Sequence, residues 1–189
     1  MQPYPVAFLH CLPFERRSPP LTASSPSRVY LLRHAKAAWA APGERDFDRG
    51  LNEAGFAEAE IIADLAADRR YRPDVLLSST ATRCRQTTQA WQRAFNEGIE
   101  IVYIDEMYNA RSETYLSLIA AQTDPQSVML VGHNPTMEAT LEAMIGEDLL
   151  HAALPSGFPT SGLAVLDHDD SAGNGKNRWR LVDFLSPGK

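Results

Sequence analysis

The sequence is poor in cysteine and has no surplus of positive charge, and each shortage removes a class of protein. The two cysteines, Cys11 and Cys84, lack the spacing of metal ligands. A disulfide framework is therefore not expected, and a reducing compartment suits the chain. The formal net charge is -6. Because binding to a phosphate backbone needs charge of the opposite sign, no nucleic-acid partner is expected.

Long apolar runs are missing as well. No stretch approaches the roughly 20 apolar residues that cross a bilayer. The short apolar stretch at residues 6–12 is followed, not preceded, by Arg16 and Arg17, which is the reverse of a secretory signal. We therefore expect no membrane partner and a cytoplasmic location. The sequence also contains neither an internal repeat nor a glycine-rich phosphate loop.

The first 27 residues differ in composition from the rest of the chain. They contain six prolines and a cluster of serine and threonine, and they show no periodicity of apolar residues. This composition predicts a disordered or loosely attached leader. The length of the remainder suits one domain, so residues 28–189 are predicted to form a single domain.

Beyond residue 28, short apolar runs alternate with helical segments. The runs suit strands buried in the middle of a sheet, and they occupy residues 29–32, 75–77, 101–104, 128–131, 163–166 and 181–184. Helical spacing predicts helices over residues 51–70, 81–96, 112–122 and 135–145. The first helix has Asn52 as its N-cap and Phe56 on its buried face, and the last has Pro135 at its first position. The alternation predicts an α/β fold, a three-layer α/β/α sandwich with a mostly parallel central sheet.

Histidines and arginines follow three of the predicted strands. Arg33 and His34 come after the first, Arg83 follows the second, and His133 follows the fourth. Ligands of such sheets bind beyond the carboxyl ends of the strands, so we expect these four side chains to meet there. A neutral imidazole can attack phosphorus, and arginines match phosphate in charge and geometry. The four residues suffice for a phosphoryl-transfer pocket that needs no metal.

Each of these residues alone has a plainer explanation. His133 is compatible with a strand-end histidine bonded to the backbone, and Arg83 with a solvated helix residue. Their placement directly after strands, in order, favours a shared site. A metal site built on His34, His133 and a carboxylate is an alternative, although the neighbouring arginines would repel a cation. Removal of metal by a chelator distinguishes the two.

Five motifs are collinear with those of a known family. Residues 31–35 are similar to an Arg-His-Gly motif with Ala35 in place of glycine, and residues 48–55 to Arg-x-Leu-Thr-x-x-Gly. Residues 78–87 match Ser-x-x-x-Arg-x-x-Gln-Thr. Residues 131–135 carry Gly-His-Asn-Pro, and residues 154–162 carry Leu-Pro followed by Thr-Ser-Gly. Together the motifs resemble the histidine phosphatase superfamily, and the last two resemble its small SixA-type branch.

The resemblance implies a phosphoglycerate mutase-like fold and a role for each matching residue. His34 would be the phosphorylated nucleophile, with Arg33, Arg83 and His133 completing the phosphate pocket. Asn134 would cap the next helix and steady His133 near the substrate.

Three further residues stand near these motifs. Lys36 is either a substrate contact at the pocket mouth or a solvated lysine. Glu106 is either the general acid or, with Asp105, a structural residue. Arg85 lies two residues after Arg83 on the same helix, so we expect it to face away from the pocket.

The implied activity is that of a metal-independent phosphohistidine phosphatase without a cofactor. Its partner would be a phosphorylated protein, such as a phosphorelay domain, because the short chain leaves few residues for a lid over a small substrate. A small-molecule phosphomonoesterase of the same superfamily is the alternative among enzymes, and a mutase is disfavoured for want of a clear acid. An inactive phosphate-binding interaction module is the alternative from another class.

Overall fold

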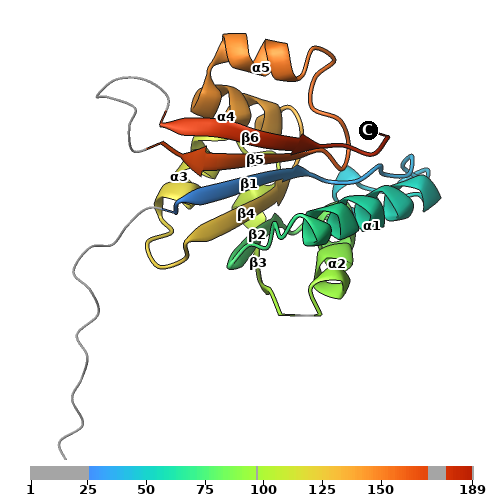
Figure 1. Ribbon diagram of the computed structural model, residues 1–189. Coiled ribbons are helices and arrows are strands. Elements are labelled where there is room, and N and C mark those ends of the chain that lie inside the picture. Colours follow the sequence, from blue (N-terminus) through green and yellow to red (C-terminus); the bar gives the residue numbers. More distant parts are fainter. Residues whose placement is uncertain (1–25, 97, 170–177, 189) are drawn as a thin grey trace, which may run out of the picture.

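Six strands form one sheet at the centre of the computed structural model, which describes residues 26–96, 98–169 and 178–188. The sheet has the order β3-β2-β4-β1-β5-β6 (Figure 1). The strands are β1 (Arg28–Arg33), β2 (Val75–Ser79), β3 (Glu100–Ile104), β4 (Ser127–Gly132), β5 (Leu163–His168) and β6 (Trp179–Leu185). The pairs β1–β4, β2–β4 and β2–β3 are parallel, whereas β1–β5 and β5–β6 are antiparallel. The predicted mostly parallel sheet is confirmed.

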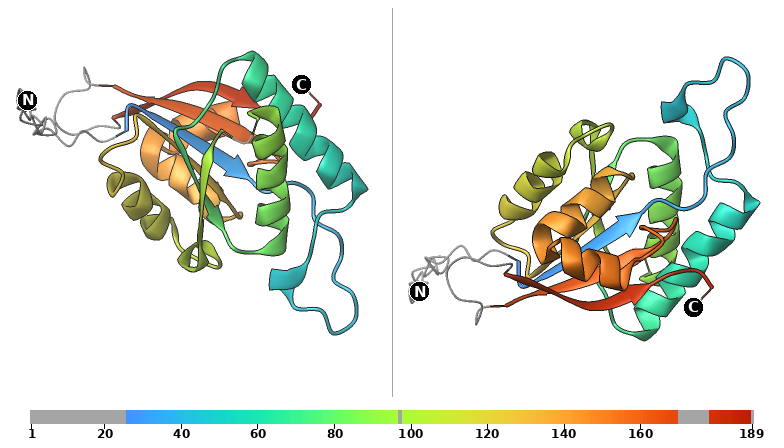
Figure 2. Two further views of the ribbon diagram at one scale, coloured as in Figure 1. Left: turned by 90° about the horizontal axis from the view of Figure 1, so that it is seen from below. Right: turned by 90° about the horizontal axis from the view of Figure 1, so that it is seen from above.

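Helices cover both faces of the sheet (Figures 1 and 2). One face carries α1 (Glu53–Asp68) and α2 (Thr82–Ala94), and the other carries α3 (Ser112–Ala120), α4 (Thr136–Ile145) and α5 (Glu147–Ala153). Successive side chains of β1 enter different cores: Val29 and Leu31 join the core under α3, α4 and α5, while Tyr30 and Leu32 join the core under α1 and α2. This alternation follows from the two-residue repeat of a strand, and it confirms the three-layer sandwich.

Helix α1 begins as the sequence predicts, but its first turn is more exposed than expected. The side chain of Asn52 accepts a hydrogen bond from the backbone N–H of Gly55 at 2.8 Å, which caps the helix. Ala59, Ile62 and Ala66 are buried against the sheet, whereas Phe56 is 41% exposed. The prediction that Phe56 is buried is therefore wrong, because the first turn of α1 packs through Gly55, whose backbone lies against that of Lys36.

The apolar runs in the sequence did not distinguish the central strands of the sheet from its edge strands. β3 and β6 lie at the two edges of the sheet, not in its middle, and Val102 of β3 is 38% exposed. Helix α5 was not predicted, because its seven residues are too few to show a period. Helix α4 starts at Thr136, so Pro135 is its N-cap residue and not its first helical residue.

Some predictions fall on residues that the structure does not describe. Residues 1–25, and Cys11 with them, lie outside the described residues, so the leader and the single-domain assignment remain predictions. Cys84 is a free, buried thiol. None of the helices within the described ranges is long and apolar enough to cross a bilayer.

Candidate active site

The backbone around His34 is fixed by its neighbours at the carboxyl end of β1. The His34 N–H donates to the carbonyl of Gly132 at 2.9 Å, and the His34 carbonyl accepts from the Ser161 N–H at 3.3 Å. The next residue, Ala35, is fully buried and donates its N–H to the hydroxyl of Thr87 at 3.0 Å. Residues from β4, α2 and the segment before β5 therefore hold this turn in place.

The imidazole of His34 presents one nitrogen without a proton. Its Nδ1 lies 2.8 Å from the carbonyl oxygen of Ala35, so Nδ1 carries the proton and donates it. Its Nε2 accepts a hydrogen bond from Nε of Arg83 at 3.3 Å. Burial lowers the pKa of His34 to about 3, against the raising effect of the Ala35 carbonyl, and the nearby His133, Arg83 and Arg33 lower it further. The ring is thus neutral at physiological pH, with the lone pair of Nε2 directed toward Arg83.

Arg83 lies in the first turn of α2 and is almost fully buried. Besides its bond to His34, it donates through Nη1 to the backbone carbonyl of Asp46 at 2.6 Å and through Nη2 to Oδ2 of Asp46 at 2.9 Å. Its guanidinium carbon lies 5.9 Å from the ring centre of Tyr108. These contacts fix the guanidinium plane beside the imidazole of His34.

Asp46 is a further residue of this site that the sequence motifs do not indicate. Its carboxylate accepts from Arg49 at 2.6 Å and from the hydroxyl of Tyr108 at 3.0 Å, in addition to Arg83. Partial burial raises the pKa of Asp46, but the hydrogen bonds from Arg49, Tyr108 and Arg83 outweigh it and bring the pKa to about 2. The Asp-x-x-Arg spacing of Asp46 and Arg49 was the one available signal, and it did not reveal the contact with Arg83.

His133 follows β4 and faces His34, with 5.1 Å between the ring centres. Its Nε2 lies 2.9 Å from the hydroxyl of Ser79 and 3.6 Å from the sulfur of Cys84. Its Nδ1 is buried and has no hydrogen-bond partner within the described residues. Burial lowers the pKa of His133 to about 4, and the nearby Arg83 lowers it further.

Arg33 contributes a second cation at the end of β1. It donates through Nη1 to the carbonyl of Phe158 at 2.5 Å, while its Nε is buried without a partner in the described part of the chain. Burial lowers the pKa of Arg33, and the charge of Glu138 opposes that effect. Glu138, which the sequence analysis also missed, accepts from the side-chain amide of Asn134 at 3.1 Å and from the Phe158 N–H at 3.0 Å.

The remaining residues predicted from the sequence lie at the margin of the pocket around His34 or outside it. Asn134 does not cap α4: its amide donates to Glu138 and to the carbonyl of Phe158, so the capping prediction is wrong. Lys36 and Glu106 are exposed, and the side chains of both are free of hydrogen bonds and ion pairs to other described residues. Arg85 donates to the carbonyl of Thr80 and stacks on Tyr103, outside the pocket, as expected.

The arrangement suits a tetrahedral anion. Arg33 and His133 each hold a buried nitrogen without a partner among the described residues, and Arg83 lies against the lone pair of His34. Buried polar atoms normally have hydrogen-bond partners, so two unpaired nitrogens beside two guanidinium groups indicate a place for ligand oxygens. No cluster of three or more His, Cys, Asp or Glu side chains suited to a metal ion occurs among the described residues.

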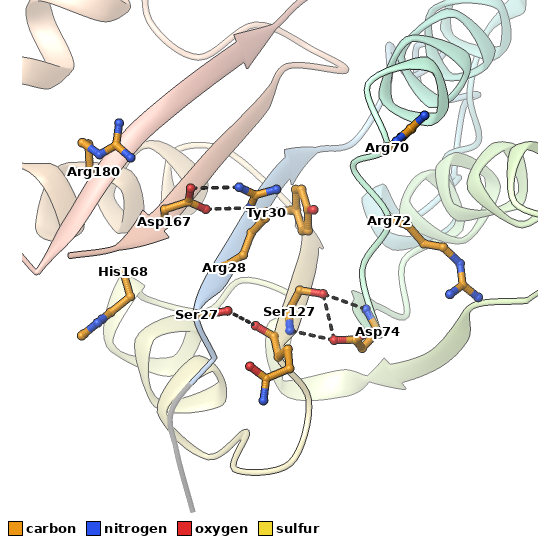
Figure 3. Close-up of a pocket in the computed structure, with 11 residues that line it drawn as sticks. Ser27, Arg28, Tyr30, Arg70, Arg72, Asp74, Ser127, Asp167, His168 and Arg180 are labelled. Carbon is orange, nitrogen blue, oxygen red and sulfur yellow. Dashed lines mark hydrogen bonds and ion pairs between the residues drawn. The ribbon is translucent and has the colours of Figure 1, made fainter. Parts of the chain in front are cut away.

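A separate polar hollow of about 570 Å³ lies at the opposite edge of the sheet, beside the start of β1 (Figure 3). Its lining includes Arg28, Tyr30, Asp167 and Ser127. Arg28 donates to both carboxylate oxygens of Asp167, at 2.6 and 2.8 Å, so its charge is already compensated. None of the residues around His34 lines this hollow.

The family description "Histidine phosphatase superfamily (branch 1)" matches residues 29–108. The crystal structure of a candidate phosphohistidine phosphatase SixA from Agrobacterium tumefaciens is 87% identical, covers 87% of this chain and 100% of that chain, and has a TM-score of 0.81. A second SixA candidate, from Nakamurella multipartitia, is 28% identical over 86% of this chain and 96% of its own, with a TM-score of 0.68. An uncharacterized protein of Mycobacterium tuberculosis is 37% identical over 71% of this chain and 85% of its own length.

These similarities agree with the collinear motifs and with the fold. The expected phosphoglycerate mutase-like fold is confirmed by the likeness to the SixA structures. The chain therefore belongs to the histidine phosphatase superfamily, and it is a phosphatase.

Proposed function

We propose that this phosphatase removes phosphoryl groups from phosphohistidine on proteins, through a covalent phosphohistidine intermediate on His34 and without a metal ion. One observation carries the proposal: the unprotonated Nε2 of His34 faces Arg83 at 3.3 Å, beside unpaired buried nitrogens of Arg33 and His133. A nucleophile and the donors for the phosphoryl oxygens are thus present at one place. The 87% identical Agrobacterium protein, a candidate phosphohistidine phosphatase, supports the same substrate class.

In the first step, the lone pair of His34 Nε2 attacks phosphorus. A bond from Nε2 to phosphorus forms while the bond from phosphorus to the substrate nitrogen breaks, and its electron pair stays on that nitrogen. The three equatorial oxygens gain negative charge in the process. Arg33, Arg83 and Nδ1 of His133 would donate hydrogen bonds to these oxygens, each worth about 10²–10³ in rate by analogy with other oxyanion donors.

In the second step, water attacks the phosphorus of phosphorylated His34. The new oxygen–phosphorus bond replaces the bond to Nε2, the water proton passes to the phosphate, and His34 returns to its neutral form. Nδ1 keeps its proton and donates it to the Ala35 carbonyl throughout, so Nε2 is the nitrogen that is phosphorylated in every cycle.

The carboxylates at the pocket favour a phosphohistidine substrate over an alkyl ester. An alkoxide leaving group needs a general acid, whereas a protonated imidazole departs as a neutral ring. Asp46, with a pKa of about 2, is ionised at neutral pH, and Glu138 accepts two N–H bonds. Glu106, the acid considered from the sequence, is exposed and forms no hydrogen bond or ion pair with other described residues.

Phosphate release from three substrates tests the proposal. The substrates are a histidine phosphotransfer domain phosphorylated with phosphoramidate, free phosphohistidine and para-nitrophenyl phosphate, each with and without a chelator. We expect release from the phosphohistidine substrates, with the ester slower by at least about tenfold in kcat/KM, no loss with chelator, and loss of activity in His34→Asn. Preference for the ester would instead favour the small-molecule phosphomonoesterase. Failure to hydrolyse any of the three would favour a binding module.

A further inference from the structure

An apolar surface that the described residues leave uncovered projects from the loop after His34. Residues 37–42 read Ala-Ala-Trp-Ala-Ala-Pro, and the last four of them are exposed. Trp39 is 95% exposed, against 58% for Leu149, the next most exposed of the large apolar side chains among the described residues. A run of exposed apolar residues is unfavourable in water, and such surfaces mark sites where another molecule binds.

The base of this surface is well anchored. Ala37 pairs with Leu51 in an antiparallel bridge, and the Ala38 N–H donates to the carbonyl of Gly50 at 2.9 Å. Arg49 donates twice to the carbonyl of Ala38, at 3.0 and 2.8 Å. Trp39 is therefore presented from a fixed backbone, which reduces the entropy lost when a partner binds.

Hydrogen bonds connect the base of this surface with the pocket. Arg49, which holds Ala38, also pairs with Asp46, and Asp46 pairs with Arg83 beside the nucleophile. The loop between β1 and α1 projects outward from the carboxyl end of β1, where His34 lies (Figure 2). A protein that brings a phosphorylated side chain to His34 must approach this edge and would meet the loop, whereas a free phosphorylated amino acid would not need to reach it.

We propose that Trp39, with Ala40, Ala41 and Pro42 around it, is the docking surface for the protein that carries the phosphohistidine. This inference rests on the proposed function and adds the surface by which the protein substrate is chosen. Tryptophan is the residue type most often found at the energetic centre of protein interfaces, because it buries a large rigid area. Docking at Trp39 adds binding energy that is available to a protein substrate and not to a small one.

Comparison of one variant on two substrates tests this surface. Trp39→Ala is measured in the full chain with the phosphorylated phosphotransfer domain and with free phosphohistidine, and Leu149→Ala serves as an exposed apolar control on α5. We expect Trp39→Ala to lower kcat/KM for the domain by about tenfold or more, through KM, which corresponds to about 1.4 kcal/mol. The rate on free phosphohistidine stays within twofold of wild type, and Leu149→Ala changes neither.

The outcomes separate this inference from the proposed function. If the wild type hydrolyses neither phosphohistidine substrate, the proposed function fails and the docking surface fails with it. If the wild type hydrolyses the domain and Trp39→Ala does so equally well, only the docking surface is refuted. An equal loss on both substrates would make Trp39 part of the pocket and not of a docking surface. A wild-type dimer that Trp39→Ala converts to a monomer, with unchanged kinetics, would show that a second copy covers the surface.

Discussion

In the proposed mechanism, Asp46 competes with the phosphoryl group for Arg83. Its carboxylate lies 2.9 Å from Nη2 of Arg83, on the same guanidinium group whose Nε meets His34. Two anions would therefore share one cation if substrate binds as proposed. The carboxylate fixes the guanidinium plane, and its negative charge also weakens the attraction between the pocket and a phosphate ion.

Removal of that charge with the shape retained should strengthen anion binding. We expect Asp46→Asn to tighten inhibition by inorganic phosphate about threefold or more at low salt, since the charge is lost while the amide oxygen still accepts from one of the two arginines, Arg49 or Arg83. The matched control is Asp48→Asn in the same turn, where Asp48 pairs with Arg45 at 2.6 Å. The test compares the inhibition constants for phosphate of the two variants and of wild type. Weaker phosphate binding in Asp46→Asn would contradict the electrostatic role of Asp46.

At the scale of secondary-structure elements, α2 ties together the loops of the pocket. Gln86 accepts from the Leu51 N–H at 2.6 Å, and Thr87 accepts from the Ala35 N–H at 3.0 Å. These two side chains explain physically why a Gln-Thr pair follows Arg83 on the helix: one turn of α2 supplies Arg83 together with the acceptors that position Leu51 and Ala35.

Loss of the Thr87 acceptor should cost stability. Thr87→Val keeps the volume of the fully buried side chain and leaves the buried Ala35 N–H unpaired, which costs about 1–3 kcal/mol in the free energy of unfolding. The control is Thr140→Val, equally buried, whose hydroxyl only donates to the Thr136 carbonyl within α4. Urea unfolding of both variants measures the difference, and equal losses would show that the tie to Ala35 is not the cause.

The elements also show which parts of the fold and site could be predicted from the sequence. His34, Arg83 and His133 directly follow strands or open a helix, so strand order alone brings them to one edge. Asp46 and Glu138 could not be predicted, because their contacts depend on how the loop with Asp46 folds onto Arg83 and how the loop with Phe158 folds onto α4. The edge positions of β3 and β6 could not be predicted for a similar reason, because an apolar run does not reveal how many strands pair with it.

At the scale of the whole molecule, two buried neutral histidines make stability depend on pH. The pKa values of about 3 for His34 and about 4 for His133 lie below the ordinary value of about 6.5 that applies in the unfolded chain. Between about pH 4 and pH 6.5 the unfolded state therefore binds more protons than the folded state. The free energy of unfolding must rise with pH across this window and fall as the solution is acidified.

The double variant His34→Asn/His133→Asn should flatten that dependence. Urea unfolding at several pH values between 4 and 7 measures the slope, and the exposed His151→Asn should keep the slope of wild type. An unchanged slope in the double variant would mean that other groups dominate the acid response. The lowered pKa values of Asp46, Asp167 and Asp183 act in the same direction but below this window.

Phosphoryl transfer through Nε2 of His34 is the central claim, and trapping the intermediate tests it most directly. The protein is mixed with phosphoramidate at mildly acidic pH and quenched in alkali. The modified residue is then located by mass spectrometry, and the phosphorylated nitrogen is identified against phosphohistidine standards, with His34→Ala as the control. We expect phosphate on Nε2 of His34 in the wild-type protein and no phosphate in His34→Ala. Phosphate on Nδ1 or on another residue, or hydrolysis that survives His34→Ala, would contradict it.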